Sequence, residues 1–172
     1  MLLTSGVNFG FYRTIPHLSG VVLGFGFLVL CVGFGLGSLF TAFPQLHLVL
    51  KVVGGLYLLY LAWRIATTTT ISNASADARP MSFMEASLFQ WVNPKAWAMA
   101  ITAVTVYTST NSPLWSLSLV IAVFLSINMP CVVLWTGFGT AFRRFLENPR
   151  VLRWFNRTMG ILLVLSIIPM IG

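Results

Sequence analysis

Charged residues are scarce in this sequence, and acids are the scarcest of all. Charged side chains make up 8% of the 172 residues, with ten Lys and Arg but only three Asp and Glu. A soluble domain carries about 25% charged residues, so this composition excludes a surface that faces water on all sides. Hydrophobic residues make up 58%, and several uncharged runs approach the ~20 residues that a bilayer-spanning helix needs. The sequence therefore predicts an all-α integral membrane protein.

The three acids lie where they cannot act together within a membrane. Asp77, Glu85 and Glu147 all fall in predicted loops or at the ends of apolar runs. General acid–base catalysis needs positioned carboxylates or histidines, and neither a His-Glu-x-x-His nor a Gly-x-Ser-x-Gly motif is present. We therefore expect no catalytic residue, and the chain is not predicted to be an enzyme.

Cysteine and histidine are equally rare, with two of each. Cys31 and Cys131 lie inside apolar runs without metal-ligand spacing, and we interpret them as small packing residues. His17 and His47 lie near opposite ends of neighbouring regions. A metal-ion carrier would need carboxylate, imidazole or thiolate ligands that converge within the bilayer. We therefore expect no metal site and no cofactor.

Five apolar runs are long enough to predict transmembrane helices. They lie at about Leu18 to Phe43, Leu46 to Ile65, Ala86 to Thr108, Leu114 to Phe138 and Phe155 to Ile171. The stretch before them, residues 1–13, is too short to cross a bilayer and is interpreted as the end of a partial first helix. The predicted architecture is a bundle of about five full transmembrane helices plus this partial helix.

Basic residues concentrate in one short segment between the last two apolar runs. Five of the ten Lys and Arg lie there, namely Arg143, Arg144, Arg150, Arg153 and Arg157. This distribution fits a cytoplasmic loop under the positive-inside rule better than a nucleic-acid footprint, so we expect no nucleic-acid partner. With that loop inside, the charges of every other loop agree with a single orientation. We therefore expect the C-terminus outside.

Two short signatures recur in the same order in each half of the chain. Val7-Asn8-Phe9-Gly10 is echoed by Val92-Asn93-Pro94-Lys95, and Lys51-Val52-Val53-Gly54 is echoed by Arg157-Thr158-Met159-Gly160. Three spans in each half would place the halves in opposite orientations, because three is odd. The pattern predicts an inverted repeat, with a first half at 1–65, a cytoplasmic loop at 66–85 and a second half at 86–172. The matches are short, so chance is the alternative.

Four segments together resemble a known family. "LLTSGVNFGFYRTIPHLSGVVLG", "KVVGGLYLLYLAWR", "WVNPKAWAMA" and "FNRTMGILLVL" are similar to the lysine-exporter and homoserine/threonine-exporter superfamily of bacterial amino-acid translocators. The resemblance runs essentially end to end. Its most specific parts are the Asn-Pro-Lys segment and the Lys-x-x-Gly-x-x-Tyr-Leu segment.

The resemblance implies a six-helix protein of the bacterial inner membrane. Such a protein exports amino acids or related small metabolites, by exchange with protons. The family begins with a first helix that carries a Pro-Gly-Pro-Asn turn before the "LLTSG" portion, and this sequence starts after that turn. Relative to the family, the chain is therefore expected to be truncated at its N-terminus, through either a misassigned start codon or a real shortening.

The segment Asn93-Pro94-Lys95 interrupts the third apolar run, in which Lys95 is the only charged residue. One interpretation is that a helix begins here and that Lys95 extends to the membrane interface. The other is a discontinuous helix, whose N-terminus presents free backbone N–H groups, a positive dipole end and the Lys95 ammonium to a carboxylate. The repeat and the resemblance favour the second, so Asn93, Pro94 and Lys95 are predicted to bind the substrate.

Two further asparagines extend the predicted substrate site. Asn8 occupies in the first half the place in the signature that Asn93 occupies in the second. Asn128 lies two residues before Pro130 in the fourth run, where hydrogen bonding between helices around a kink is the slightly favoured alternative. No acid is predicted within the membrane to pair the substrate's ammonium group. This absence favours neutral amino acids over cationic ones.

The leading hypothesis is a small exporter of amino acids, with an amino acid and the lipid bilayer as its partners and a homo-oligomer as an open possibility. The alternative is a non-transporting remnant or structural membrane protein, which keeps the fold but lacks the first-helix motif. An in-frame Pro-Gly-Pro-Asn coding sequence upstream of Met1 would favour the exporter, whereas a stop codon there would favour the remnant.

Overall fold

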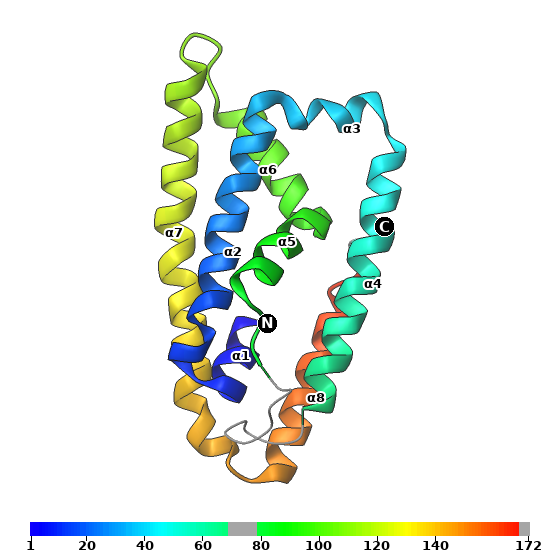
Figure 1. Cartoon of the computed structure of the whole chain (residues 1–172), viewed down its shortest axis with the longest axis vertical. Helices are drawn as coiled ribbons and strands as arrows, with labels where there is room; N and C mark the ends of the chain where they lie inside the picture. The colour runs from blue at the N-terminus through cyan, green and yellow to red at the C-terminus, as the bar shows by residue number, and fades with distance from the viewer. Residues whose placement is uncertain (69–78, 169–172) are drawn as a thin grey trace.

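The computed structural model describes residues 1–68 and 79–168, and no strand occurs in these ranges (Figure 1). The α-helices are α1 (Leu2–Phe9), α2 (Phe11–Cys31), α3 (Ser38–Ala42), α4 (Gln45–Thr67), α5 (Phe83–Val92), α6 (Pro94–Tyr107), α7 (Pro113–Phe142) and α8 (Pro149–Leu165). A π-helical turn at Val32–Leu36 follows α2, and a short 3-10 turn at Arg143–Leu146 follows α7. The predicted all-α class is confirmed for the described residues.

Three helical segments of the described chain are long and apolar enough to cross a membrane. They are Phe11–Leu36, Gln45–Thr67 and Pro113–Leu146. They correspond to the first, second and fourth predicted spans, with boundaries that differ by up to eight residues. The prediction of five full spans is therefore met in part, and the third and fifth runs differ from it for separate reasons.

The first predicted span ends earlier than the sequence suggested. It was expected to continue to Phe43, but the helix kinks at the π-helical turn, where Gly35 has a φ of 98°. Residues with a Cβ atom rarely adopt a positive φ, so a glycine is needed at this position. The chain then runs through α3 across the end of the bundle and enters α4 after Pro44 (Figure 1).

The third predicted span is divided in two by a break at Asn93. α5 ends at Val92, α6 begins at Pro94, and Asn93 between them has an extended backbone with φ −92° and ψ 106°. Each piece is too short to qualify alone as a span. The discontinuous helix that the sequence favoured at this position is present in the structure.

The fifth predicted span begins earlier than expected, because Pro149 starts α8 and Asn148 caps it. The Asn148 side chain accepts a hydrogen bond from the Arg150 backbone N–H at 2.9 Å. The end of that span, 169–171, lies outside the described residues.

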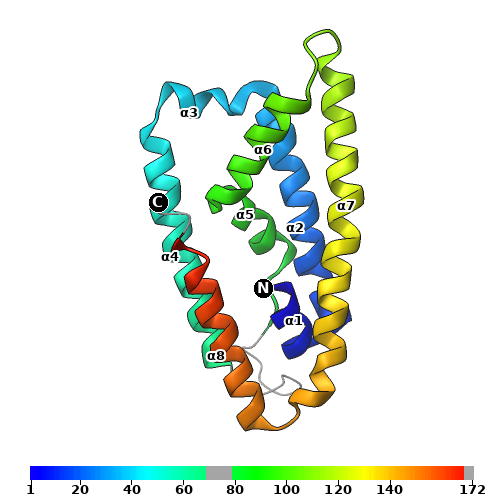
Figure 2. The same ribbon diagram turned by 180° about the vertical axis from the view of Figure 1, so that it is seen from behind.

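Helix contacts are close where one of the facing residues is glycine. A Cβ atom at Gly6 of α1 would overlap the Thr136 carbonyl of α7, and one at Gly20 of α2 would overlap the Phe83 carbonyl of α5. Small residues allow backbones to approach in this way within membranes. α4 and α8 pair separately, and Figure 2 shows them side by side at a distance from α2 and α7.

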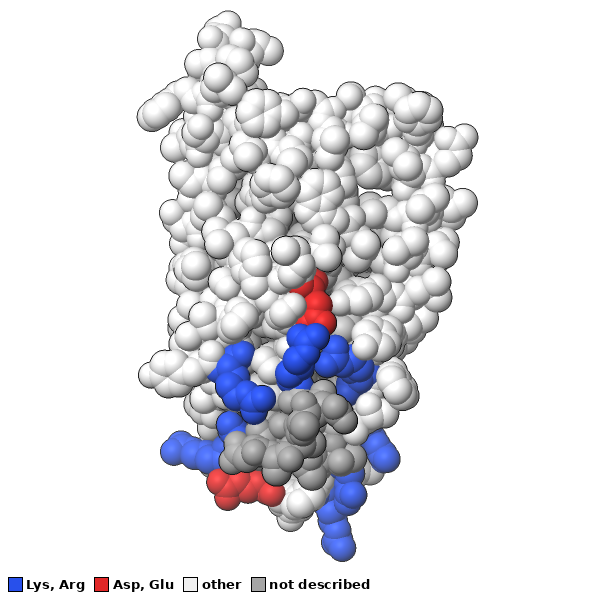
Figure 3. Space-filling model, viewed as in Figure 1, with Lys and Arg blue, Asp and Glu red and all other residues white. Residues whose placement is uncertain are grey.

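Basic side chains gather at one end of the molecule. In the view of Figure 3 the Lys and Arg atoms cluster at the end where α7 turns into α8, and the remaining visible surface is almost free of charge. This arrangement gives the bundle one basic end and one uncharged end, as the positive-inside rule requires of a protein in a membrane.

Candidate substrate-binding site

Local sequence signals account for the helix break. Ser82 caps α5 in a reciprocal capping box, because its hydroxyl accepts from the Glu85 N–H while the Glu85 carboxylate accepts from the Ser82 N–H. Asn93 then caps α6, with its side-chain oxygen 3.1 Å from the Lys95 backbone nitrogen. Pro94 fills the first helical position, where its missing N–H costs nothing. Two independent helix starts thus produce the break.

Two tryptophans bridge the break. The Trp97 indole N–H of α6 donates to the Trp91 carbonyl of α5 at 2.8 Å, and the two rings meet edge to face with centroids 5.9 Å apart. Trp97 is buried, and its ring also packs on Phe40 at 4.6 Å. The angle between α5 and α6 is therefore held by a specific hydrogen bond as well as by packing.

The backbone N–H groups at the start of α6 are already occupied. Pro94 has none, the Lys95 N–H goes to the Asn93 side chain, and the Ala96 and Trp97 N–H groups lie 3.0 and 3.3 Å from the Asn93 carbonyl. The expectation that free backbone N–H groups would hold a carboxylate is therefore wrong for this conformation. The donors left at the break are the Lys95 ammonium and the Asn93 side-chain amide.

A first cavity lies between the break and α7, and we name it the α7-side cavity. It has a volume of about 370 Å³, and its polar lining residues are Gln90, Asn93, Lys95 and Asn128, with Cys131 beside them. Small-molecule sites occupy about 300–1,000 Å³, so this volume suits an amino acid. Asn128 thus lies on the same cavity as Asn93 and Lys95.

A second cavity lies between the break and the pair formed by α4 and α8, and we name it the α4-side cavity. It has a volume of about 700 Å³, and its polar or charged lining includes Lys51, Asn93, Lys95 and Ser166. None of the lining residues of either cavity carries a carboxylate. Asn93 and Lys95 line both cavities, so the break forms the boundary between them.

Asn8 lies elsewhere. It is 2% exposed and exchanges two side-chain hydrogen bonds of 3.2 Å with Asn156 of α8, which also donates to the Thr68 carbonyl at 2.9 Å. It lines neither of the two cavities that Asn93 lines. The structure therefore groups Asn93, Pro94, Lys95 and Asn128 around the break, and it places Asn8 in a separate polar cluster.

Sequence reasoning missed three residues of this region. Lys51 was interpreted as an interface anchor, yet it lines the α4-side cavity with Lys95. Gln90 lies three residues before Asn93, and a polar residue one helical turn before a break inside an apolar run was a signal for it. Trp97 offered no comparable signal, because the sequence does not show which of the six tryptophans bonds across the break.

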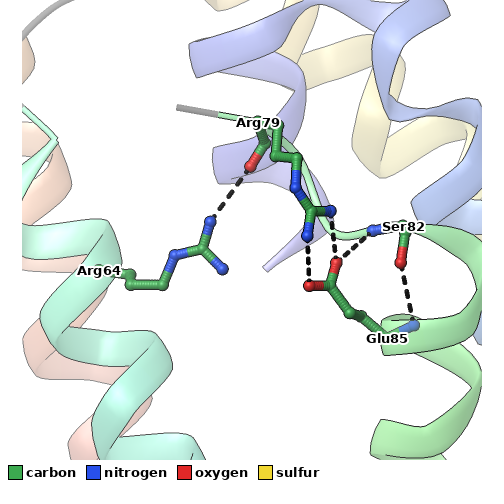
Figure 4. Close-up of polar contacts among 4 residues, drawn as sticks. All are labelled: Arg64, Arg79, Ser82 and Glu85. Atoms are coloured by element: carbon green, nitrogen blue, oxygen red, sulfur yellow. Dashed lines mark hydrogen bonds and ion pairs between the residues drawn. The ribbon is translucent and has the colours of Figure 1, made fainter. Parts of the chain in front are cut away.

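A network of polar contacts lies where α5 begins, just before the predicted third span. Figure 4 shows Arg79 donating to both oxygens of Glu85, at 2.7 and 2.8 Å, while Arg64 of α4 donates to the Arg79 carbonyl at 3.3 Å. The hydrogen bonds from Arg79 lower the pKa of Glu85 to about 2. The contacts connect the end of α4 with the start of α5 beside the basic end of the molecule.

Comparison with known proteins gives a consistent result. The sequence model of the family described as LysE type translocator matches residues 1–166. Curated relatives called cysteine/O-acetylserine efflux proteins occur in Escherichia coli strain K12 and in Shigella flexneri serotype 5b. Each is 29% identical over 173 residues, which cover 98% of this chain and 83% of the relative. No solved structure matches.

Proposed function

This chain belongs to the LysE type translocator family, and from that premise we propose that it exports neutral amino acids by exchange with protons. The family match confirms the resemblance to the lysine-exporter and homoserine/threonine-exporter superfamily that the sequence indicated. The predicted function of a membrane exporter of amino acids is also confirmed, since the matched relatives are named as efflux proteins for amino acids. These names likewise describe transport rather than an enzymatic reaction.

The substrate class follows from charge. Cysteine and O-acetylserine, which the relatives' names specify, each carry one carboxylate and one ammonium group and no further charge. The lining of both cavities contains lysine but no carboxylate, which favours a zwitterion over a cationic amino acid. We therefore propose small neutral amino acids, with cysteine and O-acetylserine as the first candidates.

The observation that carries this proposal is that Lys95 and Asn93 line both cavities at the helix break. In our proposal the substrate carboxylate binds the Lys95 ammonium and the Asn93 amide group. The substrate ammonium then donates hydrogen bonds to the side-chain carbonyl oxygens of Gln90 and Asn128 on the α7 side. A ligand held there can be reached from either cavity, which is the requirement of alternating access.

The helix contacts support an inverted repeat in the proposed transporter. In the predicted halves, α1 of the first packs on α7 of the second, while α5 of the second packs on α2 of the first. The two middle helices, α2 and α7, contact each other, and so do the two last, α4 and α8. A two-fold axis between the halves produces this set of pairs. We propose such an axis in the membrane plane, with the basic end in the cytoplasm and the C-terminus outside.

The alternative, a non-transporting remnant, has less support. Two cavities of amino-acid size meet at a capped helix break, and the break is reinforced by the bond between Trp97 and Trp91. A structural membrane protein that transports nothing would not need such cavities. We therefore favour transport, in the bacterial inner membrane, as the function of the chain.

Counterflow in proteoliposomes tests the proposal. Purified protein is reconstituted into vesicles loaded with unlabelled L-cysteine under reducing conditions, and the entry of labelled L-cysteine, O-acetyl-L-serine or L-lysine is measured. We expect counterflow of the two neutral compounds and little of L-lysine. Lys95→Met should raise the half-saturating concentration ~10- to 100-fold, the effect of losing one charge-assisted hydrogen bond.

Lys95→Arg, which keeps the charge, serves as the matched control and should retain most of the binding. If Lys95→Met leaves the half-saturating concentration unchanged, Lys95 is an interface anchor and the site is elsewhere. If the unaltered protein shows no counterflow of any amino acid, the exporter proposal fails and the remnant is favoured.

A further inference from the structure

A third cavity lies beside the basic end of the molecule, and we name it the basic-end cavity. Its lining includes Thr4, Ser5 and Asn8 of α1, His17 of α2, and Arg64 and Thr68 at the end of α4. Its volume is about 70 Å³, far less than the ~300 Å³ of small-molecule sites. A water molecule needs about 10–15 Å³ in such a measure. The basic-end cavity thus admits a few waters and no amino acid.

His17 is the unusual member of this lining. It is 3% exposed, and its Nδ1 has no hydrogen-bond partner among the described residues. Its neighbours in the lining are satisfied: Ser5 shares a hydrogen bond of 3.1 Å with Thr14, and Asn8 bonds to Asn156. A buried polar atom without a partner is costly and needs an explanation. Water in the cavity that His17 lines can supply the missing bond.

We propose that His17 binds the proton that is exchanged for the amino acid. The proposal rests on the proposed function of an amino-acid exporter. An unperturbed imidazole gains and loses a proton between pH 5 and 8. The waters that the basic-end cavity admits can carry the proton to and from it, whereas an amino acid does not fit there. Among the described residues within the spans, no acid is available for this role, because Glu85 and Glu147 lie at helix ends.

The charges around His17 come from several elements. The Met1 amino group on α1 and the Glu85 carboxylate on α5 act on it with opposite signs. Arg64 on α4 and Arg79 before α5 line the same cavity. Arg143, after α7, approaches Gly10 at the start of α2. The titratable side chains of α6 are Lys95 and Tyr107. Each of them lines a cavity other than the basic-end cavity.

The proton balance is simple. A hydronium ion that comes from the external solution gives its proton to the lone pair of an imidazole nitrogen, so one O–H bond breaks and one N–H bond forms. The imidazolium ion then returns a proton to water at the cytoplasmic end, so that an N–H bond breaks and an O–H bond forms. One neutral amino acid leaves the cell for each proton that enters, so each cycle moves one positive charge inward. Met1 lines both the basic-end cavity and the α4-side cavity, which places the proposed proton site next to the proposed substrate pathway.

Two modes of transport distinguish a proton site from a substrate site. Counterflow exchanges labelled for unlabelled L-cysteine without a pH gradient and does not need proton transfer. Accumulation driven by an acidic vesicle interior does need it, because protons must leave as L-cysteine enters. We expect His17→Gln to keep counterflow within about 2-fold of the unaltered protein and to lose at least ~10-fold in accumulation. His47→Gln, whose imidazole packs on Phe40 away from this cavity, should keep both.

Three results would overturn the proposal. These are normal accumulation by His17→Gln, loss of its counterflow along with its accumulation, and equal loss of accumulation by His47→Gln. An unaltered protein without counterflow would instead disprove the exporter function itself, so the two failures are distinguishable. If His17→Gln does not fold, the His47→Gln protein labelled with 15N-histidine keeps His17 as its sole imidazole. A His17 signal that shifts reversibly as the pH is lowered supports the proposal, and one that stays constant down to the pH at which the protein unfolds overturns it.

Discussion

Asn8 and Asn156, which lie 148 residues apart in the sequence, exchange two hydrogen bonds of 3.2 Å between buried side-chain amides. Asn156 also donates to the Thr68 carbonyl at the end of α4. This one pair therefore connects three helices, α1, α8 and α4, next to the basic-end cavity. In a membrane such a contact holds helices together where apolar side chains provide no preference between helix and lipid.

Replacing either asparagine should destabilise the protein. Asn156→Leu leaves the Asn8 amide buried without a partner, and hydrogen bonds between helices in membranes contribute ~0.6–1.7 kcal/mol each. We expect the melting temperature in detergent to fall by several degrees for each single variant. It is measured by size-exclusion chromatography of samples heated to increasing temperatures. The double variant Asn8→Leu/Asn156→Leu should lose less than the sum of the two, because neither amide is then left unpaired.

Asn111→Ala is the matched control, since Asn111 lies in an exposed turn and should change the melting temperature little. Strictly additive losses in the double variant would show that the two amides do not depend on each other.

The helix break and the asparagine pair show what the sequence can and cannot predict. Asn-Pro at a helix start acts within one turn, so the break at Asn93 was predictable from neighbouring residues alone. The partner of Asn8 depends on how α1 and α8 meet, and no local pattern contains that information. The repeat signature placed Asn8 near Asn93, whereas packing between distant helices places it beside Asn156.

The boundaries of the helices could not be predicted from the sequence for a similar reason. Hydrophobicity runs without interruption through the kink at Gly35, so composition could not locate the end of the first span. Lys51 became recognisable as a cavity-lining residue only when the volume of the α4-side cavity was known. The volume of that cavity is set by side chains from four different helices, α4, α5, α6 and α8.

The bond from Trp97 to Trp91 should be needed to hold the break. Trp97→Phe keeps an aromatic ring against Phe40 but removes the donor to the Trp91 carbonyl. We expect a loss of about 1 kcal/mol in stability, seen as a melting temperature lower by a few degrees, and a reduced rate of counterflow. Trp115 is exposed near the start of α7, so Trp115→Phe should change neither the melting temperature nor the rate of counterflow. Equal behaviour of the two variants would assign Trp97 to packing alone.

The pair formed by Arg79 and Glu85 should stabilise the protein only above acidic pH. The pKa of Glu85 falls from its usual 4.5 to about 2 in the folded chain, so the stabilisation is present above pH 4.5 and is lost as the pH falls toward 2. The melting temperature of the unaltered protein should therefore decline more steeply between pH 5 and 3 than that of Glu85→Gln. Because both side chains are partly exposed, we expect a difference of only a few degrees at pH 7. Parallel pH profiles would contradict the assignment.

The orientation of the chain can be tested with cysteine labelling. In a background with Cys31 and Cys131 replaced by serine, a membrane-impermeant maleimide applied to intact cells should react with Ser112→Cys. It should not react with Asn148→Cys in the basic segment, which the positive-inside rule assigns to the cytoplasm. Permeabilised cells provide the control, since both positions should then react. Reaction at Asn148→Cys in intact cells would reverse the orientation.

Lys51 should matter on one side of the membrane only. Lys95 lines both cavities, whereas Lys51 lines the α4-side cavity alone. If the two cavities serve the two access states, Lys95→Met should raise the half-saturating concentration of L-cysteine ~10- to 100-fold from either side. Lys51→Met should raise the half-saturating concentration by ~3- to 10-fold when L-cysteine is varied on the side to which the α4-side cavity opens, because the Lys51 ammonium acts on the substrate at longer range. When L-cysteine is varied on the opposite side, the increase should be less than 2-fold. The measurement compares right-side-out with inside-out vesicles, and Lys51→Arg should restore the affinity. Equal effects of Lys51→Met on both sides would show that the two cavities are not separate access routes.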